Sequence, residues 1–118
     1  MKSGKTGIVS YTRNTELGES GKDFMFAEIL FDEDSKKIIN FTVIQFCEIA
    51  QTTYQVKKHD FSHGVYNVHK YYSEKPERRE MKGETLSHSL VEKCKNDIKN
   101  NWKAYREEFE IMLFRGKV

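Results

Sequence analysis

The residues able to do chemistry are concentrated in one short segment, residues 58–72, with the sequence KHDFSHGVYNVHKYY. Three of the chain's four histidines, His59, His63 and His69, lie there beside Asp60. Histidine transfers protons near neutral pH because its ordinary pKa is about 6.5. A carboxylate can orient an imidazole, so this mixture predicts general acid–base chemistry with His63, His69 and Asp60 as the catalytic set.

Basic and polar side chains alternate with these histidines. Lysine ammonium groups hold phosphate by charge, and amide and phenol groups nearby donate hydrogen bonds. The predicted binding residues are Lys57, Lys58, Lys70, Tyr66 and Asn67. Beside proton-transfer groups, such residues favour a phosphodiester substrate, and RNA is the leading choice.

The same histidines offer a second interpretation, a metal site. Three imidazoles and a carboxylate suit zinc or a related divalent ion. The ligands would be His59, His63 and His69, with Asp60 next to them. Because their spacing matches no established ligand motif, we expect no cofactor, and zinc or a similar ion is the alternative. A third interpretation is a solvated polar hairpin without chemistry.

The register of this hairpin decides which of its groups meet. A four-residue turn at 61–64 would pair Asp60 with Val65, whereas a two-residue turn at His63-Gly64 would pair Asp60 with Asn67. Shifting a strand by one residue moves every side chain to the other face of the sheet. The sequence leaves both registers open.

The stretch Asp60-Phe61-Ser62-His63-Gly64, followed by His69, resembles the D-x-x-H-G…H signature of small uncharacterised bacterial and archaeal proteins. It is also similar to the histidine-bearing strands of TumE-like ribonuclease toxins from toxin–antitoxin modules, although the proline-containing PHH-type run of those toxins is absent. The resemblance implies an RNA-cleaving role for His63 and His69. It also implies a protein antitoxin as partner.

The elements that position these residues follow from the hydrophobic pattern. Alternation predicts a short strand at 7–13, a hairpin with strands at 22–31 and 37–49, and a second hairpin with strands at 52–60 and 65–72. From about residue 85 the period becomes 3.6, which predicts a helix capped by Thr85 or Ser87. We expect residues 109–114 to form its last turn, and Trp102 to lie on its apolar face.

These elements predict an α+β fold, an antiparallel sheet of about five strands packed against one long C-terminal helix. The 118 residues, 37% hydrophobic and 32% charged, fit one domain. Residues 1–5 are expected to be a flexible start, 6–72 the sheet, 73–82 a charged connector and 83–115 the helix. The first hairpin is apolar on both sides, so we expect a homodimer.

Other features narrow the class of protein. Cys47 and Cys94 show no metal-ligand spacing and are expected to be small buried hydrophobic residues. No apolar run is long enough for a signal peptide or a membrane span, so we expect a cytoplasmic protein without a membrane partner. The expected function is RNA-acting or toxin-like, with RNA or a cognate protein as partner. The alternatives are a non-enzymatic dimerisation or interaction module and a metal-binding domain.

Overall fold

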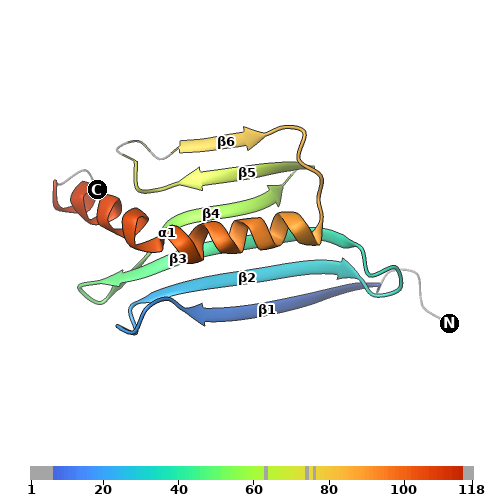
Figure 1. Cartoon of the computed structure of the whole chain (residues 1–118), viewed down its shortest axis with the longest axis horizontal. Coiled ribbons are helices and arrows are strands. Elements are labelled where there is room, and N and C mark those ends of the chain that lie inside the picture. The colour runs from blue at the N-terminus through green and yellow to red at the C-terminus, as the bar shows by residue number, and fades with distance from the viewer. Residues whose placement is uncertain (1–6, 63, 74, 76, 116–118) are drawn as a thin grey trace.

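The computed structural model describes residues 7–62, 64–73, 75 and 77–115, so the expectations for residues 1–5 and for His63 lie outside the described residues. The strands are β1 (Ile8–Glu16), β2 (Asp23–Asp32), β3 (Ile38–Ile49), β4 (Thr52–Ser62), β5 (Val65–Lys70) and β6 (Glu77–Met81), followed by the helix α1 (His88–Phe114). Each strand pairs antiparallel with the next in the order β1-β2-β3-β4-β5-β6 (Figure 1). The predicted α+β class is confirmed.

The sheet contains one strand more than predicted. Residues 77–81, with the sequence ERREM, form β6 and pair with β5, so the prediction that 73–82 is a connector is wrong for this part. β6 is an edge strand with exposed charged side chains. Edge strands of this composition are common because charge discourages pairing with other chains, and they carry little hydrophobic alternation in the sequence.

The helix begins at His88, five residues after the predicted start at 83, and of the two predicted caps Ser87 is the one in place. The Ser87 hydroxyl accepts a hydrogen bond from the backbone N–H of Leu90, 3.1 Å away, which satisfies a donor of the first helical turn. At its other end α1 reaches Phe114, so residues 109–114 are helical as predicted. β1 also extends beyond its predicted end, to Glu16.

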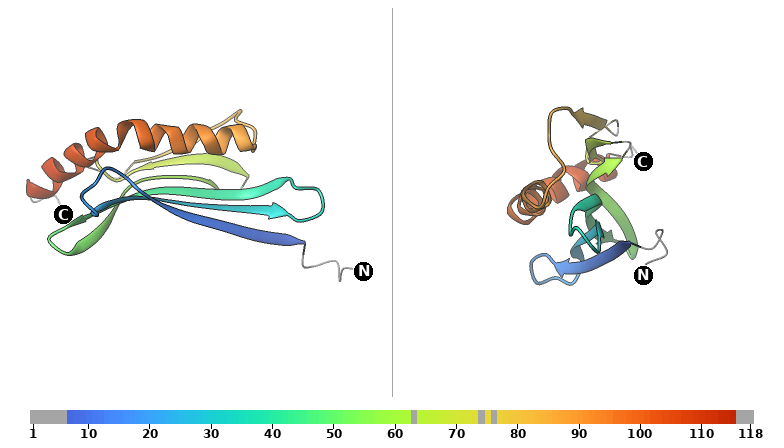
Figure 2. Two further views of the ribbon diagram at one scale, coloured as in Figure 1. Left: turned by 60° about the horizontal axis from the view of Figure 1, so that its bottom comes forward. Right: turned by 90° about the vertical axis from the view of Figure 1, so that its right-hand side faces the viewer.

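The helix lies across β2, β3 and β4 on one face of the sheet, and the core forms between them (Figure 2). Side chains that alternate along the strands meet the apolar stripe of α1, and Trp102 packs half-buried against them. Two buried clusters result, one including Met25, Phe41, Val43, Val91 and Ile98, the other formed by Cys47, Val56 and Phe109. This packing leaves the opposite face of the sheet, here called the open face, without a helix in the described part of the chain.

The open face has an apolar half and a polar half. Phe24 pairs with Phe46 and Phe26 pairs with Ile44 across β2 and β3, and these side chains alternate with core residues such as Met25. The three phenylalanines are half-buried and Ile44 is buried. The polar half lies on β4, β5 and β6 and contains one group of the predicted site residues, Lys58, Asp60, Asn67 and His69. The sequence therefore places chemistry and apolar surface on one face.

Candidate functional site

The β4–β5 hairpin adopts one of the two registers that the sequence left open. Asp60 pairs with Asn67 and Lys58 pairs with His69, as a two-residue turn requires. Because successive strand residues point to opposite faces, this register divides the predicted residues into two groups. Lys58, Asp60, Asn67 and His69 lie on the open face. Lys57, His59, Tyr66 and Lys70 lie on the helix side.

On the open face, Asp60 holds His69 in a fixed orientation. Oδ2 of Asp60 lies 3.1 Å from Nε2 of His69, and Oδ1 accepts a hydrogen bond from the Asn67 amide at 3.1 Å. The Lys58 ammonium lies 3.7 Å from the same carboxylate. Asp60 is buried, with 4% of the residue exposed. Its role is therefore to orient the His69 imidazole and not to contact a ligand itself. Two members of the predicted catalytic set are thus in contact.

The second ring nitrogen of His69 is available to a substrate. Within the described residues Nδ1 has no hydrogen-bond partner, and 19% of the side chain is exposed. The ring stacks on Tyr71, with 6.0 Å between ring centroids. Burial and the nearby Asp60 raise the pKa of Tyr71, which keeps its phenol neutral. An imidazole oriented by a carboxylate, with one nitrogen free, is the arrangement that general acid–base catalysis needs.

Two cations flank this histidine. Lys58 approaches Asp60, and Nη1 of Arg78 on β6 lies 3.5 Å from the side-chain oxygen of Asn67. Arg78 pairs with His69 across β5 and β6, and its side chain is 52% exposed. Arg78 was not among the predicted residues, because only the pairing of β6 with β5 places it here. The two adjacent arginines in the connector were the available signal.

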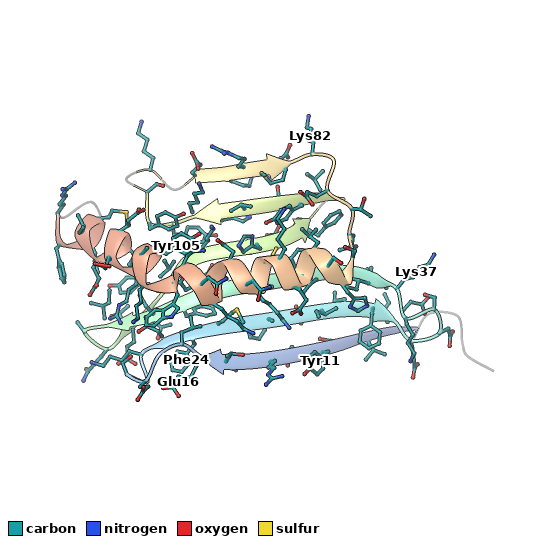
Figure 3. All side chains as sticks on the ribbon, in the orientation of Figure 1. Tyr11, Glu16, Phe24, Lys37, Lys82 and Tyr105 are labelled. Carbon is teal, nitrogen blue, oxygen red and sulfur yellow. The ribbon has the colours of Figure 1, made fainter. Side chains whose placement is uncertain are left out.

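A separate polar network joins the sheet to the helix. Nε2 of His59 lies 2.9 Å from Oδ2 of Asp97, and Nδ1 lies 2.7 Å from the Tyr66 hydroxyl. The Lys57 ammonium lies 2.8 Å from Asp97 and donates to the hydroxyl of Tyr105 at 3.0 Å. Tyr105 lies on the side of α1 that faces β4 (Figure 3). Because both ring nitrogens of His59 are engaged, this histidine positions the helix and has no free nitrogen for a substrate.

The charge states of Asp97 and Tyr105 follow from their burial and from their hydrogen bonds. Burial raises the pKa of Asp97, but hydrogen bonds from His59, Lys57 and Tyr105 outweigh that effect and hold the pKa well below its ordinary value. The ionised Asp97 therefore accepts a hydrogen bond from Nε2–H of His59, and the Tyr66 hydroxyl can donate one to Nδ1. Burial together with Asp97 raises the pKa of Tyr105, so its phenol stays neutral. Asp97 was not predicted, and its position beside the apolar stripe of the helix was the only signal.

The comparisons with known proteins identify a family but no activity. Residues 11–114 match the family model described as Domain of unknown function (DUF7718). The chain belongs to this family. No curated protein and no solved structure matches the chain. Nowhere in the described ranges does a helix combine the length and the apolar composition of a membrane span.

The predicted metal ligands of this DUF7718 domain do not converge. His59 faces the helix and His69 faces the opposite side of the sheet, so the two cannot bind one ion, and His63 lies outside the described residues. Across the described ranges, no three side chains of His, Cys, Asp or Glu gather as a metal site. Cys47 and Cys94 are buried free thiols, and burial raises the pKa of each to about 11.

Proposed function

We propose that this protein binds RNA on the open face and cleaves it by acid–base chemistry at His69. The observation that supports this proposal is the 3.1 Å contact between Asp60 and Nε2 of His69, a half-buried side chain whose Nδ1 has no hydrogen-bond partner within the described residues. His59 is the less suitable base, since Tyr66 and Asp97 occupy both of its nitrogens. A cytoplasmic location, where RNA is available, is part of the proposal.

The chemistry follows from the groups present. Nδ1 of His69 takes the proton of a ribose 2′-hydroxyl, the 2′-oxygen bonds to the adjacent phosphorus, and the bond from phosphorus to the 5′-oxygen breaks. The leaving 5′-oxygen needs a proton from a second group, a role that the sequence analysis assigns to His63. Asp60 fixes the orientation of the His69 ring through its contact with Nε2.

The surroundings of His69 suit a phosphate backbone. Lys58 and Arg78 lie on the same face, and cations of this kind contribute most of the affinity for nucleic acids. RNA differs from DNA in carrying the 2′-hydroxyl that serves as nucleophile. Acid–base groups and cations therefore favour RNA as the substrate over DNA.

The test is cleavage of a labelled single-stranded RNA by the full chain and by His69→Ala. We expect His69→Ala to reduce the rate about 100-fold, the usual contribution of a general base. The matched control is His88→Ala, since His88 is exposed at the start of the helix and lies outside this site. Equal rates for wild type and His69→Ala, or no cleavage by wild type, would contradict the proposal. Growth arrest on expression that depends on His69 would further support a toxin-like role.

A second candidate function is a dimerisation module, favoured by the apolar half of the open face. Phe24, Phe26 and Phe46 form a continuous half-buried surface that α1 does not cover. Contiguous apolar surface of this kind usually marks an interface, here with a second copy. Sedimentation at micromolar concentration should show a dimer that Phe24→Gln weakens and Tyr11→Gln, on exposed β1, does not. A wild-type monomer of 13.9 kDa would contradict it.

A further inference from the structure

A pocket lies on the helix side of the sheet, away from the open face. α1 covers β2, β3 and β4 and leaves β5 and β6 beside it (Figure 1). The pocket of about 250 Å³ occupies the angle between the flank of α1 and these two strands. It will be called the flank pocket, and its walls include Val68, Lys70, Arg79, Met81, Lys93 and Asp97.

Besides Lys57, which pairs with Asp97, three cations from three different elements line the flank pocket. Lys70 comes from β5, Arg79 from β6 and Lys93 from α1. Lys70 and Lys93 make only loose ion pairs, at 3.7 Å to Glu77 and 3.4 Å to Glu84. Arg79 has neither an ion pair nor a hydrogen bond within the described ranges. These side chains therefore have capacity to bind an anion.

The acidic residue of the pocket wall does not cancel this charge. Asp97 already accepts from His59 and pairs with Lys57 at 2.8 Å, so its negative charge is compensated inside the wall. Arg79 then faces the pocket with a charge that is unpaired within the described residues, and Lys70 and Lys93 face it with charges that Glu77 and Glu84 compensate at longer distances. A forked guanidinium with two ammonium groups matches the several terminal oxygens of a phosphate dianion better than the two oxygens of a carboxylate.

The apolar side chains of the pocket wall indicate the chemical character of the part of the ligand that is not phosphate. Val68 pairs across the sheet with Arg79, and Met81 pairs with Tyr66, so apolar surface adjoins the cations. The volume of about 250 Å³ lies just below the roughly 300–1,000 Å³ of ordinary ligand pockets, which suits a ligand with one ring. We propose that the flank pocket binds a small phosphomonoester, with the phosphate held by Arg79, Lys70 and Lys93 and a compact apolar body against Val68 and Met81.

The two neighbouring arginines of β6 offer a matched pair of variants. Arg79 lines the flank pocket, whereas Arg78 lies on the open face near Asn67, and Arg→Gln removes the same charge from the same strand in both cases. Calorimetric titration of the full chain with phenyl phosphate should show binding that Arg79→Gln weakens by about tenfold or more. Arg78→Gln should change the affinity less than about twofold, since its charge faces away from the pocket.

Titrations with two other anions distinguish specific binding of a phosphomonoester from nonspecific attraction between opposite charges. Inorganic phosphate should bind more weakly than phenyl phosphate because it lacks the apolar body, and benzoate should bind more weakly because it carries one charge. Lys93→Gln, an exposed change on the helix, is a second variant expected to weaken binding if Arg79→Gln does not fold. No binding at millimolar phenyl phosphate, benzoate binding as tightly, or equal losses in the two arginine variants would overturn the proposal. RNA cleavage by Arg79→Gln should be unchanged, so the two proposals fail independently.

Discussion

Nε2 of His59 on β4 lies 2.9 Å from Oδ2 of Asp97 on α1, so an imidazole and a carboxylate join the sheet to the helix. The carboxylate also accepts from Lys57 and from Tyr105, which lies eight residues further along α1. A partly buried carboxylate held by several donors is costly to remove, because each donor then loses its partner. Because Asp97 is titratable, the contacts that hold the helix on the sheet depend on pH.

The variant Asp97→Asn should lower the free energy of unfolding by about 1–3 kcal/mol at neutral pH, since buried donors lose a charged acceptor. The folded pKa of Asp97 lies below its ordinary value of 3.8, so the folded state binds its proton less tightly than the unfolded state. Its stabilisation is therefore complete above pH 3.8 and is lost as the pH falls toward the folded pKa. Urea unfolding between pH 7 and pH 3 measures this effect.

The control for Asp97→Asn is Glu107→Gln, which removes an exposed negative charge from the same helix. We expect the difference between wild type and Asp97→Asn to narrow in acid, and Glu107→Gln to track wild type at every pH. A difference that is constant with pH would show that Asp97 acts through packing and not through its charge.

Gly18 leaves room for the Trp102 ring. A Cβ atom at Gly18 would lie 2.8 Å from Cζ2 of Trp102, and the residue has a φ of 70°. Gly21, in the same loop, has a φ of 74° but its Cβ would meet nothing closer than Glu16 at 3.9 Å. Alanine strains the backbone at both positions, but only Gly18→Ala adds a clash. Gly18→Ala should therefore destabilise the chain by about 1–3 kcal/mol more than Gly21→Ala does.

Thermal unfolding followed by the fluorescence of Trp102, the only tryptophan, measures this comparison. The native emission of Gly18→Ala should also change, because the ring must move. Equal melting temperatures with unchanged emission would mean that the indole does not rest on Gly18.

The two thiols should be unreactive in the folded protein. Burial raises the pKa of Cys47 and of Cys94 to about 11, so almost no thiolate exists at neutral pH. Reaction with a disulfide reagent at pH 7.5 should be about 100-fold slower than in urea. The variants Cys47→Ala and Cys94→Ala report each thiol separately, and rapid labelling of either one in the native protein would contradict its buried position.

The same two thiols predict alkaline instability. Because their folded pKa exceeds the ordinary value of 9.0, their contribution is complete below pH 9.0 and declines as the pH rises toward 11. Urea unfolding from pH 8 to pH 10.5 should show the decline. The free energy of unfolding that is lost between pH 8 and pH 10.5 should be smaller in Cys94→Ala than in wild type.

His63 is assigned a role from the sequence alone, as the second proton-transfer group. His63→Ala should reduce RNA cleavage about 100-fold, the usual contribution of a proton-transfer group, and its melting temperature is measured beside wild type to show that the fold is kept. The double variant His63→Ala/His69→Ala should cost little more than either single variant, because groups that act in one step are not additive. If the double variant instead lost the product of the two single rate reductions, His63 and His69 would act in separate steps.

Local sequence patterns determined most of the fold. Alternating apolar residues along 38–49 and a 3.6-residue stripe along 88–114 predicted a strand and a helix that the structure contains. These patterns depend only on neighbours in the chain, because burial on one face imposes the period of each element. The concentration of histidines in 58–72 was likewise visible without a structure.

The tertiary structure decided how those residues combine. β6 exists because the backbone of 77–81 completes hydrogen bonds with β5, and a charged edge strand has no hydrophobic pattern of its own. The β4–β5 register placed Asp60 with His69 and turned His59 toward Asp97, whereas a shift by one residue would have exchanged these faces. Asp97 lies 38 residues from His59 in the chain, and contacts between residues so distant depend on how the helix docks, which no local pattern encodes.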